Sequence, residues 1–302
     1  MSETLPSPIT TLTASQRTQI LNLIRRAARA EILPRFRALS PDQIASKSDS
    51  QDLVTAADVA AEAMIARGLA RMFPGALIVG EEATAADPGL RDKIDEAETA
   101  FAIDPVDGTW NFATGLSTFG VMLAMTRFGR PVFGLLYDPL NDDVIWSAEG
   151  EHAVLQSPRR AARVLQTSDG GKVEDVTGCI PLFMIPPALR GAVAATLPGF
   201  RRVLSLRCSC HEYRMLAQGH IDFVLSAGLT PWDHAPGALI VARAGGHVAM
   251  INGDPFTAGT KKGYLLAAAN AETWGRVRDA LTMLIDTDQP WAAPKQDGPD
   301  HD

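Results

Sequence analysis

The first apolar positions of the chain recur with the spacing of an amphipathic helix. Between residues 15 and 39 they follow one another at short helical intervals, which predicts a helix over this segment. The positions concerned are Ile20, Ile24, Ala27, Ala28 and Ile32. A second helix is predicted to start at Thr55, because Thr55 and Asp58 form an S/T-x-x-D/E start signal ahead of a further apolar run.

The pattern then changes to short runs rich in β-forming residues, separated by Gly, Pro, Asn and Asp. These runs cover 76–79, 101–103, 119–126, 132–137 and 144–146. The last two are predicted to be adjacent antiparallel strands, joined through Asp138 and Pro139 and then Asn141 and Asp142. Residues 156–178 show no regular pattern, and an irregular segment is expected there.

Helices and strands alternate in the remainder of the chain. Predicted helices lie near 187–196, 209–218, 233–244 and 271–285, and predicted strands near 202–206, 221–226, 247–251 and 264–268. The mixture predicts an α/β protein of layered helices and sheets. We expect an N-terminal α+β part at 1–155, a C-terminal α/β part at 156–286 and a disordered tail at 287–302.

Composition and charge narrow the possible partners. The chain has 302 residues, of which 46% are hydrophobic and 21% charged, so it is long enough for one large core or two smaller ones. Its net charge is −7, and the last 17 residues hold five Asp against one Lys. The body without that segment carries about −3, which argues against a general nucleic-acid or anionic-membrane surface.

The absence of targeting signals and the few cysteines favour a cytoplasmic protein. The first 13 residues hold no basic residue and no apolar run, unlike a secretory signal. No stretch approaches the roughly 20 apolar residues of a membrane span. The three cysteines, Cys179, Cys208 and Cys210, are too few for a disulfide framework. We therefore expect a reducing cytoplasmic location, with neither nucleic acid nor a membrane as partner.

Three segments place carboxylates where a predicted strand or loop ends. They contain Glu81 and Glu82, then Asp104 and Asp107, and finally Asp233. In the middle segment, IDPVDGTWNF, an Asp closes a predicted strand, a Pro stops the ladder, and Asp-Gly-Thr turns the chain. This arrangement would aim both of its aspartates at one point.

The same segment offers backbone N–H donors to an anion. The carboxylates of the three segments, taken together, favour a bound cation. The N–H groups of Gly108 and Thr109 can bind anionic oxygens, although D-x-x-D-G-T alone is equally typical of a capped turn. Carboxylates about 4 Å apart repel by roughly 4 kcal/mol at an effective dielectric of about 20, so converging segments need a hard cation. All-oxygen ligands favour Mg²⁺ or Mn²⁺ over Zn²⁺.

These motifs resemble those of the inositol monophosphatase family. The resemblance rests on GEE at 80–82, DPVDGTWNF at 104–112, WDHAPGALIVARAGG at 232–246 and DLVTAAD at 52–58, with Lys47 where the family has a loop lysine. The motifs keep the family's order and approximate spacing, and the similarity runs from about residue 15 to 285. The resemblance implies the family's layered sandwich fold and its dimeric habit.

The resemblance also implies a set of metal ligands. One Mg²⁺ would be held by Glu81, Asp104 and the backbone carbonyl of Val106, and a second by Asp104, Asp107 and Asp233. Two or three ions are expected, and Mn²⁺ is an alternative. Glu82 is interpreted as a support for the ligands.

Further roles follow from the same resemblance. Asp58 and Thr109 would orient and deprotonate the metal-activated water, and the amides of Gly108 and Thr109 would bind phosphate. Asp107 and Ser226 would also contact substrate.

Several of these residues have structural alternatives. Asp58 is equally suited to capping its helix, and Asp233 to the first turn of another. The run from Cys208 to Arg214 matches the C-x5-R pattern of cysteine phosphatases, but it lacks glycine and places Glu212 where the anion would lie. No second ligand pair supports a zinc site there, so a packed helix start is expected. Trp110, Phe112 and Phe119 are interpreted as core.

The region that would select the substrate departs from the family pattern. A stretch that usually reads G-S-A-A is Arg207 to Cys210 here, and Ser226 replaces a Glu that contacts inositol hydroxyls in the family. Arg243 stands where E-A-G-G has its Glu. Losing an acceptor for a sugar hydroxyl reduces discrimination by about 1 to 3 kcal/mol, so inositol is less secure than the metals. Arg207 or Arg243 would suit a second anionic group on the substrate.

The function expected from the sequence is therefore a lithium-sensitive, Mg²⁺-dependent phosphomonoesterase that forms a homodimer. Inositol monophosphate is the default substrate, with histidinol phosphate and 3'(2'),5'-bisphosphate nucleotides as alternatives. A hypothesis of another class is a non-catalytic protein that binds a partner in a metal-dependent way. Asp58 and Thr109 favour catalysis, because they are needed only to activate water.

Overall fold

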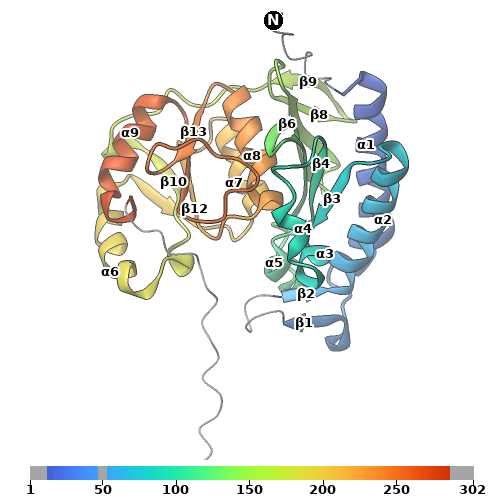
Figure 1. Ribbon diagram of the computed structural model, residues 1–302. Coiled ribbons are helices and arrows are strands. Elements are labelled where there is room, and N and C mark those ends of the chain that lie inside the picture. The colour runs from blue at the N-terminus through green and yellow to red at the C-terminus, as the bar shows by residue number, and fades with distance from the viewer. Residues whose placement is uncertain (1–11, 47–52, 286–302) are drawn as a thin grey trace, which may run out of the picture.

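Alternating layers of helices and sheets make up the computed structural model, which describes residues 12–46 and 53–285 (Figure 1). A helical layer covers a seven-stranded sheet, a second helical layer separates this sheet from a five-stranded one, and a third covers the outer face of the latter. The layered α/β class predicted from the sequence is confirmed. Lys47 and the tail predicted at 287–302 lie outside the described residues.

The first helical layer packs its apolar stripe against the seven-stranded sheet. The helical path of the first predicted helix continues through a π-helical turn at Ala28–Ile32 and a 3-10 turn at Leu33–Arg35. The start predicted at Thr55 is confirmed, because the Thr55 and Asp58 side chains form a capping box. The elements of this region are α1 (Ala14–Ala27), β1 (Ile44–Ser46), β2 (Leu53–Thr55) and α2 (Ala56–Met72).

The seven-stranded sheet follows chain order from β3 to β9, with β3 and β4 parallel and all later pairs antiparallel. Three short helices, α3, α4 and α5, leave the ends of β3 and β4. The strands are β3 (Leu77–Gly80), β4 (Ala100–Asp107), β5 (Gly120–Arg127), β6 (Arg130–Asp138), β7 (Asp143–Ala148), β8 (Val154–Ser157) and β9 (Arg160–Val164). The short helices are α3 (Glu81–Ala86), α4 (Gly89–Asp92) and α5 (Thr109–Thr114).

An irregular segment was expected at 156–178, and this is wrong for residues up to Val164. β8 and β9 form a hairpin there and extend the first sheet to Val164. Every side chain of β9 is exposed, so this strand has no apolar alternation that sequence reasoning could detect. We propose that the two predicted parts meet between β9 and β10 rather than at residue 155, because each sheet then lies within one part.

The five-stranded sheet lies between the middle and outer helical layers. Its order is β11-β10-β12-β14-β13, with parallel pairs at the β11 side and antiparallel pairs at the β13 side. Its strands are β10 (Thr177–Cys179), β11 (Arg202–Leu204), β12 (Phe223–Ser226), β13 (His247–Met250) and β14 (Leu265–Ala268). The middle helices are α7 (Ser209–Ala217) and α8 (Pro231–Arg243), and the outer ones α6 (Pro187–Thr196) and α9 (Ala271–Ala280). Among the described helices, none is long and apolar enough to span a bilayer.

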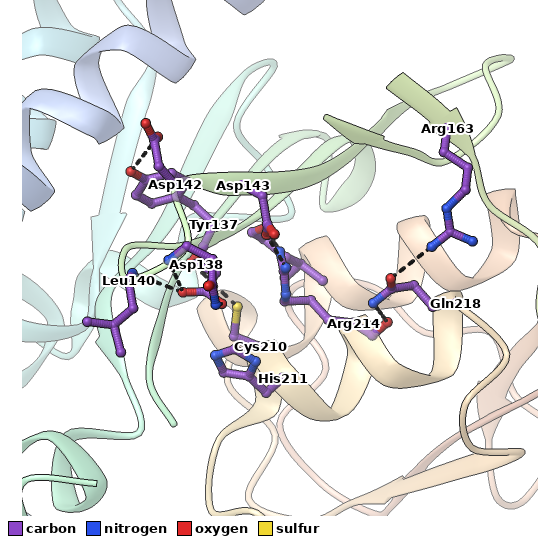
Figure 2. A network of polar contacts seen from close by, with 12 residues as sticks. Tyr137, Asp138, Leu140, Asp142, Asp143, Arg163, Cys210, His211, Arg214 and Gln218 are labelled. Atoms are coloured by element: carbon purple, nitrogen blue, oxygen red, sulfur yellow. Dashed lines mark hydrogen bonds and ion pairs between the residues drawn. The ribbon is translucent and has the colours of Figure 1, made fainter. Parts of the chain in front are cut away.

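The middle helices are fixed tightly to the seven-stranded sheet. Arg214 of α7 reaches across to pair with Asp143 of β7 and donates to the Leu136 carbonyl at 2.8 Å, and Figure 2 shows the pair. Gly134 of β6 lies so close to α8 that an added Cβ would sit 2.6 Å from the Pro236 carbonyl oxygen. Because α8 begins with Asp233 in its first turn, this contact helps to position the functional site.

Gly134→Ala should therefore destabilise the fold. The added methyl meets backbone atoms of α8, and overpacking of this kind costs about 1 to 3 kcal/mol. Urea unfolding measures the change. Gly191→Ala is the matched control, since nothing lies within 4 Å of its added Cβ; in the helix α6 it should stabilise by about 0.5 to 1 kcal/mol. Equal stability of the two variants would contradict the close-approach argument.

Candidate metal centre and catalytic pair

Three predicted site carboxylates meet at one point. Asp104 and Asp107 come from β4 and Asp233 from the first turn of α8, and each offers an oxygen within 4.8 Å of the others. Asp104 is 2% exposed and Asp107 is 6% exposed. Glu81, the first residue of α3, lines the same cavity. The structure thus brings together acids that lie far apart in the sequence.

A bulge in β4 puts Asp104 and Asp107 on one side. The sequence suggested that Pro105 stops the strand, and this is wrong, because β4 continues to Asp107. Asp104 pairs with Met122 and Asp107 with Gly120, so three steps on β4 oppose two on β5. Residues three apart in a regular strand point to opposite faces, and the extra residue reverses that relation.

The start of α7 holds Asp107 in place. The Cys208 thiol donates to its Oδ2 at 2.9 Å, and the amide of Cys210 donates to the same oxygen at 2.6 Å. The Ser209 amide donates to Oδ1 at 3.2 Å. The packed helix start expected here is present, but sequence reasoning missed that it binds a site carboxylate. The only available signal was the position of these residues at a helix N-terminus, where amides are free to donate.

Burial and crowding raise the pKa values of these acids. The pKa of Asp104 lies well above its ordinary value, first because the group is buried and then because Glu81, Asp233 and Asp107 are close. Burial and then Asp233 raise the pKa of Asp107 to about 7, against the opposing effect of its three hydrogen-bond donors. A divalent cation among these oxygens would offset the repulsion. The donor set, all carboxylate and carbonyl oxygen, fits a hard ion such as Mg²⁺ or Mn²⁺.

Asp58 and Thr109 also meet beside this cluster. The Thr109 hydroxyl lies 3.1 Å from Asp58 Oδ1 and 3.0 Å from the Val106 carbonyl oxygen. Asp58 is fully buried, and its other oxygen accepts from the Thr55 amide at 2.9 Å. Asp58 thus caps α2 and contacts Thr109 at once, so its two alternatives are compatible. Capping fixes the carboxylate's orientation.

The predicted anion donors and substrate contact line the same cavity. Gly108 has a left-handed backbone with φ of 85°, and a Cβ there would lie 2.9 Å from the Thr118 carbonyl oxygen, which explains the glycine. Gly108, Thr109 and Ser226 all line the cavity. The Ser226 hydroxyl lies 3.3 Å from the Tyr213 hydroxyl, which is 3.3 Å from His234 Nδ1.

Sequence reasoning missed Glu62, which positions the start of α3. Its carboxylate accepts from the amides of Glu82 and Ala83 at 2.7 and 2.8 Å. An added Cβ at Gly80 would lie 2.2 Å from the carboxyl carbon of Glu62, so the glycine of GEE makes room for this contact. The available signal was the spacing of Glu62, four residues after Asp58 on α2. The supporting role of the Glu82 side chain stays a prediction.

The aromatic residues in and just after the DPVDGTWNF motif divide between core and cavity. Phe112 and Phe119 are buried and pack edge to face with ring centroids 5.0 Å apart, as predicted. Trp110 instead lines the cavity, so its assignment to the core is wrong. The Arg207 guanidinium lies 4.3 Å from its ring centroid.

The cysteine-phosphatase interpretation of the run from Cys208 to Arg214 is excluded. Figure 2 shows Arg214 directed to Asp143 on the sheet, so it cannot cradle a phosphate beside Cys208. Burial raises the pKa of the Cys208 thiol well above its ordinary value, and Asp107 raises it further, so no nucleophilic thiolate is favoured. In the part of the chain described here, the three aspartates are the one group of three or more His, Cys, Asp or Glu residues close enough together to hold a metal ion.

Comparisons with known proteins agree with this geometry. The sequence profile of the inositol monophosphatase family matches residues 13–282. An inositol-1-monophosphatase from Bacillus subtilis (strain 168) is 30% identical over 218 residues, covering 71% of this chain and 78% of the relative. The Nus factor SuhB from Escherichia coli (strain K12) is 31% identical over 246 residues, covering 78% and 86%.

A solved structure shows the same fold. An inositol monophosphatase from Zymomonas mobilis superimposes with a TM-score of 0.72 at 24% identity, covering 89% of this chain and 99% of that chain. The profile match spans most of the sequence, including every motif on which the predicted site rests. The chain belongs to the inositol monophosphatase family, a family of metal-dependent phosphatases.

Proposed function

We propose that this protein is a Mg²⁺-dependent phosphomonoesterase that acts on a small phosphorylated metabolite, with inositol monophosphate as the family's default substrate. One observation carries the proposal: the buried Asp104 and Asp107 and the half-buried Asp233, with oxygens within 4.8 Å of one another, lie beside the hydrogen-bonded pair of Thr109 and Asp58. A cluster that served only to bind a cation would not need this pair.

The proposed ligands follow the positions of the acids. Glu81, Asp104 and the Val106 carbonyl would hold one Mg²⁺, and Asp104 would share the second with Asp107 and Asp233. Such ions supply positive charge for the phosphoryl and leaving oxygens and lower the pKa of a water. Apart from His234, whose pKa is lowered by burial, and Arg207, the polar wall of the cavity is neutral or acidic, so an empty site would repel a phosphate dianion.

The chain's own groups would orient the reactants. The Thr109 hydroxyl is proposed to accept from the attacking water while it donates to Asp58, and Asp58 Oδ1 would receive the proton through it. The amides of Gly108 and Thr109 would donate to the phosphate oxygens. Asp107 and Ser226 would face the substrate, and Ser226 is neutral where the family's Glu would bind a sugar hydroxyl.

A second candidate is a binding protein without catalytic activity. The observation in its favour is that one relative is named as a Nus factor. The Thr109 and Asp58 pair favours the enzyme, and phosphate release separates the two candidates. Sensitivity to Li⁺, a homodimer and a cytoplasmic location remain predictions from the family resemblance.

Asp233→Asn should abolish metal-dependent phosphate release. Loss of one cation ligand removes several kcal/mol of charge stabilisation, so the rate should fall by about 10³-fold or more. Without metal, the variant should melt no lower than the wild type because one repelling charge is gone. Added Mg²⁺ should raise the melting temperature of the wild type and not of the variant. The exposed Asp169→Asn is the control, and full activity in Asp233→Asn would overturn the proposed metal site.

Thr109→Ala should separate catalysis from metal binding. The hydroxyl that links the water to Asp58 is lost, and general-base assistance is worth about 10²- to 10⁴-fold. The Mg²⁺-induced rise in melting temperature should remain. Thr109→Ser keeps the hydroxyl and should retain most activity. If both variants turned over substrate equally, the proposed path of the proton would be wrong.

The raised pKa values predict how metal-free stability depends on pH. The aspartates ionise near pH 3.9 when unfolded, but the pKa of folded Asp107 is about 7. Between these values the unfolded state releases protons first, so the contribution of Asp107 to stability falls as pH rises. The difference in unfolding free energy between the wild type and Asp107→Asn, measured in EDTA, should decline from about pH 4 to about pH 7. A flat difference would contradict the crowding argument.

A further inference from the structure

Arg207 occupies an unusual place on the wall of the site. Among the described residues that line the cavity, it is the one lysine or arginine. It immediately precedes Cys208, whose thiol donates to Asp107. Arg243, the other arginine that departs from the family pattern, is the last residue of α8 and lines no part of this cavity.

The backbone at Arg207 is one that favours glycine. Its φ is 53°, in the left-handed region that residues with a Cβ rarely adopt. The loop is held there because the Asn111 amide donates to the carbonyls of Leu206 and Thr118, both at 2.8 Å. A glycine would adopt the same backbone conformation without strain. The presence of an arginine here therefore suggests that its side chain has a role.

Two aromatic rings position the guanidinium at the cavity. Its central carbon lies 4.3 Å from the Trp110 ring centroid and 5.4 Å from that of Phe183. Stacked in this way, a guanidinium directs its N–H groups outward in its own plane, where they suit a carboxylate or phosphate. Arg207 also has a further interaction within the chain, which a substrate anion would join or replace.

Apart from the proposed metal ligands, one carboxylate, that of Glu212, is among the described residues that line the cavity. Ser226 contributes a neutral hydroxyl to this wall. Glu212 accepts the Leu206 amide at 2.8 Å, which ties it to the loop that carries Arg207. A second anionic group on the substrate would therefore meet the Arg207 guanidinium and the Ser226 hydroxyl, while the Glu212 carboxylate is engaged by the Leu206 amide.

We infer that Arg207 is a specificity-determining residue that favours phosphomonoesters whose leaving group carries a second anionic group. This inference rests on the proposed phosphatase function and assigns its substrate class. The reaction is the same hydrolysis: the water oxygen bonds to phosphorus, the phosphorus–oxygen ester bond breaks, and the proton that water loses is balanced by the one that the leaving oxygen takes up. The second anion binds Arg207 and stays on the product alcohol.

The test compares matched substrates that differ by one anion. Adenosine 3'-monophosphate against adenosine 3',5'-bisphosphate tests a second phosphate, and glycerol 3-phosphate against 3-phosphoglycerate tests a carboxylate. In at least one pair, the wild type should prefer the substrate whose leaving group carries the additional anion, by about 10- to 100-fold in kcat/KM, the range of one charge-assisted contact. The effect should appear mainly in KM.

Three variants isolate the side chain. Arg207→Gly relieves the left-handed strain, so it should melt no lower than the wild type while losing the preference and keeping activity on the substrates that lack the second anionic group. Phe183→Ala, at a half-exposed ring, should weaken the preference partly. Arg243→Gln is the control and should keep it. A uniform loss across all substrates in Arg207→Gly, or an unchanged preference, would overturn the assignment.

Calorimetry of the same compounds with the Mg²⁺-loaded protein distinguishes the two ways of failing. Binding that prefers the second anion and depends on Arg207, without any phosphate release, would overturn the phosphatase function and retain the assignment of Arg207. Phosphate release without such a preference would overturn the assignment of Arg207 and retain the phosphatase function. Equal binding of both members of each pair would overturn the role of Arg207 whatever the turnover.

Discussion

Mutual repulsion among buried carboxylates is the constraint around which this structure is built. Asp104, Asp107 and Asp233 present oxygens within 4.8 Å of one another, and the burial of Asp104 and Asp107 withholds much of the water that would screen them. Hydrogen-bond donors hold each acid in place: the Val106 amide for Asp104, the start of α7 for Asp107 and the Thr230 hydroxyl for Asp233. The spacing of the acids, on which the proposed metal site depends, is therefore a property of the whole layered arrangement, which prevents the acids from moving apart.

Helix starts supply much of that support. α7 directs two amides and a thiol at Asp107, and Asp233 lies in the first turn of α8. The N-terminus of a helix carries partial positive charge, which favours anions. These helices lie between the two sheets, and α8 approaches β6 at Gly134 with backbone contact. The helices that pack between the two sheets are thus the same helices that position the acids of the site.

Local signals in the sequence predicted the elements, whereas contacts between distant segments did not follow from them. The capping box at Thr55 and the order of the acidic motifs lie in short stretches that can be read directly, and both were found. The bulge through Pro105 depends on pairing with β5, and the role of Glu62 depends on where α3 begins. β9 was not predicted because all its side chains are exposed, so its sequence has no alternation of apolar and polar residues. Trp110 was assigned to the core because an aromatic residue does not reveal which neighbour it packs against.

The layered order of the chain bears on how the protein folds as it is made. Glu81, Asp104 and Asp107 belong to the sheet that forms from the first half of the sequence, whereas Asp233 comes from a helix inserted behind that sheet much later. Contacts of such long sequence separation form slowly, and domains generally fold from the N-terminus during synthesis. The nascent first sheet therefore spends time with an incomplete ring of acids. Packing of α8 against the sheet is the step that would complete the proposed set of metal ligands.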